Sequence, residues 1–173
     1  MVRTLALLVL VASPAVYAAD GESAISVSAD FASLIVDQGT TIRPNEKSGV
    51  GGLVNVDYQR GFGDSFWLRA ALGGGGVGVN GQAGYAMVGT VGLTYAVDIL
   101  KYVPYVGIGA GGVLVGGGAL DPHLDPVIDL AAGIELQESP SLSFSLEGRF
   151  ESLWAKTTLF FIGPRVSFKW GYF

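Results

Sequence analysis

Apolar and polar residues alternate through the C-terminal part of the chain. From Leu142 onward the even-numbered positions are mostly apolar and include Phe144 and Phe150, whereas the odd-numbered positions carry serine or charged side chains. After a short gap the alternation resumes between Phe160 and Tyr172. A repeat of two residues predicts β-strands with one apolar face and one polar face.

Strands of this kind need an apolar solvent on one side and a polar filling on the other. The chain is 50% hydrophobic, but these residues are spread along it and do not form the runs of about twenty that a transmembrane helix requires. Transmembrane β-barrels have this pattern, because their strands turn apolar side chains to the lipid and polar side chains to the interior. The alternation therefore predicts a membrane-spanning barrel.

The strand pattern occurs in eight segments that are separated by turn residues. They cover residues 24–36, 49–61, 65–76, 82–97, 103–116, 126–137, 142–154 and 158–172. We predict an all-β fold, an eight-stranded antiparallel up-and-down transmembrane β-barrel formed by residues 19–173. Long polar loops are expected at residues 37–48 and 117–126 and tight turns at residues 62–64 and 138–141. An even number of strands places both termini at the periplasmic end and the long loops at the outer end.

One stretch allows another interpretation. The chain has no charged residue between Ala70 and Val97, and this segment is rich in glycine. A glycine-packed transmembrane helix is the alternative. The run Gly73 to Gly76 would be poor helix, whereas glycine permits strong curvature in a small barrel. We therefore expect strands here.

The N-terminus has the features of a secretory signal. Arg3 is followed by an apolar run from Leu5 to Ala12, which is too short to span a bilayer. We predict a cleavable signal peptide at residues 1–18, with cleavage after Ala18 or, alternatively, after Ala19. An uncleaved N-terminal anchor is the other possibility. The chain contains no cysteine, which excludes a lipoprotein.

Aromatic residues gather near the predicted strand ends. Trp67 and Tyr105 fall near the periplasmic ends and Phe161 falls toward the outer end, together with most of the other tyrosines, phenylalanines and tryptophans. Two aromatic girdles at the membrane interfaces are therefore expected.

Two short motifs resemble those of known barrels. The segment Pro104-Tyr105-Val106-Gly107-Ile108-Gly109-Ala110-Gly111 resembles a Pro-Tyr-x-Gly-x-Gly-x-Gly strand that is frequent in small outer-membrane barrels. Gly148-Arg149-Phe150 resembles the Glu-x-Arg-aromatic stretch of their penultimate strand. The chain thus resembles the superfamily that includes the OmpA-type transmembrane domain, OmpX and OmpW. This resemblance implies an integral protein of the outer membrane of a Gram-negative bacterium.

Charged side chains of both signs occupy the polar face of the predicted strands. In an eight-stranded barrel the interior is just filled by side chains, so we expect these residues to pair there and close the barrel. A polar path for small solutes is the alternative. A three-residue hairpin loop at 155–157 would place Glu147 opposite Arg165 and Ser143 opposite Lys169. The predicted interior polar network comprises Asp30, Asp57, Arg69, Asp129, Glu135, Glu147, Arg149, Glu151, Arg165 and Lys169.

Catalytic and cofactor sites have little support. The only histidine, His123, lies in a predicted loop with no neighbouring serine, and a metal site of Asp121, His123 and Asp125 would lack a fixed geometry. The two G-x-G-x-x-G matches, at residues 76–81 and 107–112, do not open a helix of a βαβ unit. We expect no catalytic residues, no metal and no cofactor.

The sequence favours a structural, surface-exposed outer-membrane protein that is not an enzyme. A narrow channel of the OmpW kind for small or hydrophobic solutes is the alternative, and a lipid-modifying enzyme is a third. The expected partners are the lipid bilayer, lipopolysaccharide and the outer-membrane assembly machinery, which would recognise the C-terminal strand ending in Phe173. The formal net charge of −5 argues against nucleic acid. A monomer is expected.

Overall fold

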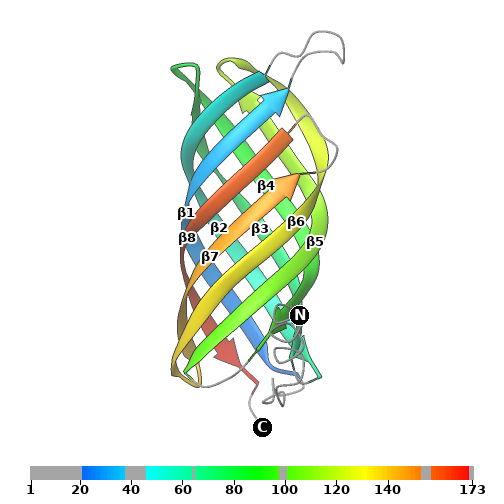
Figure 1. The fold of residues 1–173 in the computed structure, drawn as a ribbon, viewed down its shortest axis with the longest axis vertical. Helices are drawn as coiled ribbons and strands as arrows, with labels where there is room; N and C mark the ends of the chain where they lie inside the picture. Colours follow the sequence, from blue (N-terminus) through cyan, green and yellow to red (C-terminus); the bar gives the residue numbers. More distant parts are fainter. Residues whose placement is uncertain (1–20, 38–45, 64, 98–100, 153–156, 172–173) are drawn as a thin grey trace, which may run out of the picture.

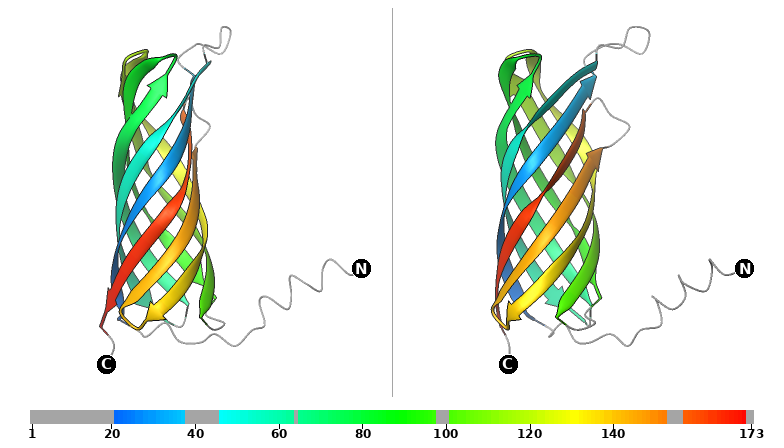
Figure 2. Two further views of the ribbon diagram at one scale, coloured as in Figure 1. Left: turned by 90° about the vertical axis from the view of Figure 1, so that its left-hand side faces the viewer. Right: turned by 60° about the vertical axis from the view of Figure 1, so that its left-hand side comes forward.

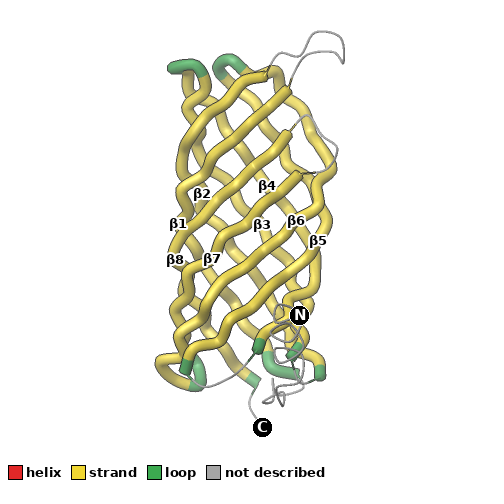
Figure 3. The backbone as a smooth tube through the Cα atoms, in the orientation of Figure 1, coloured by secondary structure: helices red, strands yellow, loops and turns green. Residues whose placement is uncertain are grey.

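The computed structural model describes residues 21–37, 46–63, 65–97, 101–152 and 157–171. Eight strands form a closed barrel in which each pairs antiparallel with its neighbour in sequence and the last pairs with the first. Figure 1 labels them, and Figures 2 and 3 show the tilted strands winding around a tall cylinder. The strands are β1 (Ser23–Asp37), β2 (Glu46–Phe62), β3 (Phe66–Val79), β4 (Gln82–Ala96), β5 (Tyr102–Gly117), β6 (Leu120–Ser139), β7 (Leu142–Ser152) and β8 (Thr157–Trp170).

The fold prediction is confirmed. The glycine-rich segment forms β3 and β4, so the helical interpretation of that segment is wrong. In the part of the chain that the structure describes, no helix is long and apolar enough to cross a membrane. Ser23 pairs with Trp170 at one end of the barrel. This end is called the terminal end, and the opposite end, where β1 finishes at Asp37, is called the distal end; they are at the bottom and top of Figure 1.

The alternation of the sequence separates the two faces of the wall. Phe31, Leu72 and Ile108 are examples of large apolar side chains that point outward and are more than half exposed. An apolar surface that runs around the whole barrel is stable in lipid and not in water. The barrel is therefore built to span a membrane.

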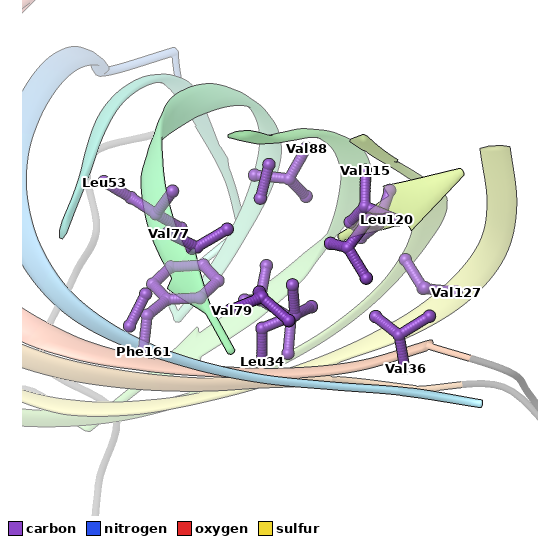
Figure 4. Packing of buried hydrophobic residues seen from close by; sticks show 14 residues of the cluster. Leu34, Val36, Leu53, Val77, Val79, Val88, Val115, Leu120, Val127 and Phe161 are labelled. Atoms are coloured by element: carbon purple, nitrogen blue, oxygen red, sulfur yellow. The ribbon is translucent and has the colours of Figure 1, made fainter. Parts of the chain in front are cut away.

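Apolar side chains fill most of the distal half of the interior, which is a feature that the polar-inside prediction missed. These side chains pack against one another across the barrel, and none is more than 5% exposed (Figure 4). They are called the apolar layer and comprise Ala32, Leu34, Val36, Leu53, Val77, Val79, Ala86, Val88, Val113, Val115, Leu120, Val127, Leu159 and Phe161.

The predicted loop at residues 117–126 is wrong. β5 continues to Gly117, a tight turn follows, and β6 begins at Leu120. Gly117 and Gly118 have φ angles of +84° and +58°, a conformation that favours glycine and lets the chain reverse within a few residues. Most of the predicted loop is therefore strand. The other predicted long loop is shorter than expected, because β2 begins at Glu46; residues 38–45 lie outside the described residues.

Two prolines caused this error, because proline usually marks a loop or an edge strand. Pro122 and Pro126 lie on β6 beyond its last pair with β7, which joins Ile128 to Ser152. Gln137 donates its N–H to Lys101 on the β5 side, so the even-numbered residues of β6 direct theirs to the other side. Proline has no N–H group. At positions 122 and 126 the missing N–H would point toward the β7 side, where no described residue of β7 pairs with β6, so the hydrogen bonds to β5 are kept.

The predicted register between β7 and β8 is wrong by two residues. Arg165 pairs with Ser145, and Glu147 pairs with Gly163. Ser143 pairs with Ser167 and not with Lys169. The described part of β7 ends at Ser152, two residues before the predicted end, and β8 begins at Thr157, one residue before the predicted start. A shift of two residues keeps every side chain on its predicted face.

The aromatic prediction is correct for part of the set. Trp67, Tyr105 and Phe161 point into the barrel and are buried, so they belong to no girdle. Phe66 remains exposed at the terminal end and lies 5.2 Å from Tyr95 between ring centroids. Such exposed aromatic groups suit a membrane interface.

Candidate functional site

The terminal half of the interior holds a network of buried charges from six of the eight strands. Every member is at most 7% exposed. This set is called the ionic layer and comprises Asp30, Asp57, Arg69, Asp129, Glu147, Arg149, Glu151 and Arg165. Each member sits at an inward position of its strand, as the alternation requires.

Glu147 lies at the centre of the ionic layer. Arg69 donates from Nη1 to Oε2 at 3.0 Å and from Nη2 to Oε1 at 2.6 Å. Arg165 donates from Nη1 to Oε2 at 2.9 Å, and the Tyr105 hydroxyl donates to the same oxygen at 2.8 Å. Two guanidinium groups and a phenol therefore surround one carboxylate, which is a strong and directional arrangement.

Asp57 joins all three arginines of the ionic layer, with Arg149 Nη1 the most distant at 3.9 Å from Oδ1. Arg69 donates to its Oδ1 from Nε at 3.0 Å and from Nη2 at 2.9 Å. Arg165 Nε lies 3.5 Å from the other carboxylate oxygen. Arg69 of β3 thus bridges two carboxylates, one on the adjacent strand β2 and one on β7 across the barrel.

Arg149 organises the part of the ionic layer next to the apolar layer. It donates to Asp129 from Nε at 3.0 Å and from Nη2 at 2.6 Å, and to the Thr90 hydroxyl at 2.7 Å. Its guanidinium carbon lies 5.1 Å from the centroid of the Phe161 ring, a cation–π distance. Phe161 is therefore the contact between the two layers.

Two carboxylates of the ionic layer receive fewer charged hydrogen-bond donors than Glu147. Asp30 accepts hydrogen bonds from Ser28 at 2.6 Å and from Asn55 at 2.5 Å. Glu151 lies 3.3 Å from Arg149 Nη2, and neither of its oxygens accepts a hydrogen bond from the described residues. Glu151 is nevertheless fully buried. The network is thus unevenly satisfied, and Glu147 has the most donors.

The two remaining predicted residues close the terminal end. Lys169 donates to Glu135 at 2.5 Å, and its ammonium nitrogen lies 5.8 Å from the centroid of the Trp67 ring. The structure therefore places all ten predicted network residues inside the barrel, with seven in one chain of ion pairs, Asp30 attached by neutral donors, and Lys169 with Glu135 as a separate pair.

The sequence analysis missed the neutral members of the network. Tyr105, Thr90 and Asn55 each bond to a charged group. Tyr105 was assigned to the lipid-facing girdle because the glycines that follow it obscure which face of β5 points inward. Tyr105 is two residues after Val103, which points inward, so the two-residue period of the strand could have placed Tyr105 on the inner face.

A cavity of about 10 Å³ lies beside Arg69, Thr94 and Asp129, which is room for about one water molecule. The described residues contain no group of three histidine, cysteine, aspartate or glutamate side chains that could hold a metal ion.

His123 lies in β6 and not in a loop. Its Nε2 is 3.2 Å from the Thr157 hydroxyl oxygen of β8 and 3.5 Å from an oxygen of Asp125. Its Nδ1 is 2.8 Å from the carbonyl oxygen of Asp121. The sequence analysis found no hydroxyl neighbour for His123, because Thr157 is distant in sequence.

Comparison with known proteins gives the fold. No family model matches the chain, and no curated protein matches it. Among solved structures, Neisserial surface protein A aligns with a TM-score of 0.66 and 10% identity, over 87% of this chain and 100% of that chain. The outer membrane protein OprG from Pseudomonas aeruginosa aligns with a TM-score of 0.62 and 10% identity, over 90% and 100% of the two chains.

A third structure, the N-terminal β-barrel domain of Pseudomonas aeruginosa OprF, aligns with a TM-score of 0.57 and 13% identity, over 87% of this chain and 98% of that chain. The resemblance to small outer-membrane barrels predicted from sequence is confirmed. The chain has the fold of integral proteins of the bacterial outer membrane.

Proposed function

We propose that the protein is a closed, structural barrel of the outer membrane that anchors its distal loops at the cell surface. The observation that carries this proposal is the filling of the interior by two different layers. The ionic layer pairs its charges within the barrel, and the apolar layer packs fourteen buried apolar side chains into the distal half. An ion would have to cross both layers in series.

The apolar layer is the stronger barrier of the two. Its members Leu34, Val113 and Leu159 have no exposed surface, and moving an ion into such surroundings without a partner is very costly. In this proposal the barrel contacts the bilayer and lipopolysaccharide, is not an enzyme, and works as a monomer. A signal peptide at residues 1–18 and recognition of the Phe173 end by the assembly machinery belong to the same proposal; both lie outside the described residues.

Conductance measurements test the closed barrel. The refolded protein, verified by a heat-shift gel, is expected to give no steady current in planar lipid bilayers, because an ion would have to leave water to pass the ionic layer and the apolar layer. An open porin in the same membranes provides the control for detection. Steady unitary currents from the wild-type barrel would contradict the proposal.

A second function, passage of small apolar solutes, is favoured by one observation. The interior of the distal half is apolar, and beside it β7 ends at Ser152 while β6 runs on from Ile128 back to Leu120. In Figure 1 the upper ends of β7 and β8 lie below those of β6 and β1. An apolar dye that entered liposomes faster with the barrel than without it, while ion currents stayed absent, would favour this function over a purely structural role.

A further inference from the structure

The strands of the wall carry one exposed basic side chain, and it lies at the terminal end. Of the lysines and arginines on the described parts of the eight strands, only Arg60 is exposed. It lies near the end of β2, two residues after Tyr58, and both side chains point outward. A charged side chain is costly in the hydrocarbon region of a membrane. Arg60 therefore lies where the outer surface meets the polar groups of the bilayer.

Three strands place aromatic side chains beside Arg60. Ser23 of β1 pairs with Arg60 on one side and with Trp170 of β8 on the other. The rings of Tyr58 and Trp170 lie 6.4 Å apart between centroids, and both are exposed to the surroundings of the barrel. Tyr58, Arg60 and Trp170 are called the interfacial patch.

Hydrogen bonds hold the polar groups of the interfacial patch together. The hydroxyl oxygens of Ser23 and Tyr58 lie 3.3 Å apart, and the Arg60 side chain forms a hydrogen bond with the same Tyr58 hydroxyl. A guanidinium has five N–H groups, so one bond to the phenol leaves further donors for a ligand. The guanidinium is thus positioned beside the phenol before any ligand arrives.

The donors of the interfacial patch suit a phosphate group. A guanidinium binds phosphate through two parallel hydrogen bonds, and a phenol hydroxyl and an indole N–H can each donate one more. Tyrosine and tryptophan side chains lie at the level of the lipid headgroups, and the long arginine side chain reaches the same level. The described terminal halves of β1, β2 and β8 present no exposed carboxylate that would repel an anion.

We propose that Tyr58, Arg60 and Trp170 bind the headgroup phosphate of an anionic glycerophospholipid. This inference rests on the proposed function, in which the distal loops lie at the cell surface and the terminal end lies in the opposite leaflet. In an outer membrane that leaflet consists of glycerophospholipids, whereas lipopolysaccharide occupies the outer leaflet. One cation at the membrane surface favours an anionic lipid by about fivefold, and an anionic headgroup has no ammonium group to compete for its phosphate.

Quenching of Trp170 fluorescence by brominated lipids tests the site. The chain has three tryptophans, so Trp67→Phe with Trp154→Phe leaves Trp170 as the only one, and a heat-shift gel verifies the folded barrel. In phosphatidylcholine vesicles, brominated phosphatidylglycerol is expected to bind about fivefold more tightly beside Trp170 than brominated phosphatidylcholine. Equal quenching by small fractions of the two lipids would overturn the proposal.

Two substitutions separate the site from the net charge of the barrel. In the single-tryptophan barrel, Arg60→Gln is expected to make the two lipids quench equally. Lys101→Gln is the matched control, because Lys101 lies at the same end in a surface ion pair with Glu138 at 3.5 Å, and it is expected to keep the fivefold preference. A preference that survives Arg60→Gln, or that Lys101→Gln abolishes as well, would refute the site.

Native mass spectrometry gives a second measurement that keeps all three tryptophans. Phosphatidylglycerol is expected to stay bound to the wild-type barrel and to be lost from Arg60→Gln. Displacement of the phospholipid by lipopolysaccharide would show that the patch prefers the lipid of the other leaflet and would overturn the inference. Arg60 lies outside the barrel, so ion currents through the interior would refute the closed barrel without changing the lipid preference.

Discussion

Glu147→Gln is expected to lower the free energy of unfolding of the barrel by roughly 3–5 kcal/mol, the range for breaking a buried ion pair by removing one partner. Arg69 and Arg165 both donate to this carboxylate, and neither guanidinium can reach water to recover its hydration. A neutral amide would leave both cations undercompensated inside the barrel. Urea unfolding in lipid vesicles, followed by tryptophan fluorescence, measures the change.

Glu151→Gln is the matched control for this prediction. Glu151 is on the same strand, equally inward and fully buried, but its contact with Arg149 is 3.3 Å long and its oxygens accept no hydrogen bond from the described residues. The same substitution is expected to change the free energy of unfolding several-fold less than at Glu147. The reason is that the Glu151 carboxylate loses few favourable contacts when its charge is removed. Equal losses at the two positions would contradict the unequal roles assigned to them.

Gly163→Ala is expected to destabilise the barrel at the junction of β1 and β8. A Cβ at this position would overlap the carbonyl oxygen of Ala29 and lie 2.7 Å from Asp30 Cα. These are backbone atoms that cannot move aside without shifting β1. Overpacking of this kind costs about 1–3 kcal/mol and occasionally more, and the expected value is at or above the upper end. Urea midpoints and the heat-shift gel provide the measurement.

Gly148→Ala tests whether steric crowding causes the loss of stability expected for Gly163→Ala. Gly148 lies on β7, outward and paired with Ile162, and a Cβ added there meets no atom within 4 Å. This variant is expected to unfold at the same urea concentration as the wild type or slightly higher, because alanine reduces the entropy of the unfolded chain. If both variants lost stability equally, crowding at Gly163 would not be the cause.

Alternation alone was sufficient to predict the barrel and its strand number, and it assigned each charged network residue to one face of its strand. The reason is that successive side chains of a strand point to opposite faces. When one face meets lipid and the other meets the barrel interior, odd-numbered and even-numbered residues therefore differ in polarity. Even a register error of two residues between β7 and β8 left Glu147 and Arg165 on the same face, where they form an ion pair at 2.9 Å although they are not paired in the ladder.

The apolar layer could not be predicted in the same way. Toward the distal end of β1, Leu34 and Val36 point inward and Ile35 points outward, so both faces are apolar and the two-residue period disappears. The glycines of β3 and β5 have a similar effect, because a residue without a side chain gives no indication of its face. Contacts between distant strands, such as that of His123 with Thr157, depend on the tilt and closure of the barrel.

The prolines of β6 have a consequence for self-association. An exposed strand edge normally offers a row of N–H donors on which a second chain can extend the sheet, and this is how edge-to-edge polymers begin. On the side of β6 that faces away from β5, Pro122 and Pro126 provide no such donors. A strand from another copy would find only Leu124 able to donate between them. The one stretch of wall where the described sheet is open is thereby a poor template for fibre growth.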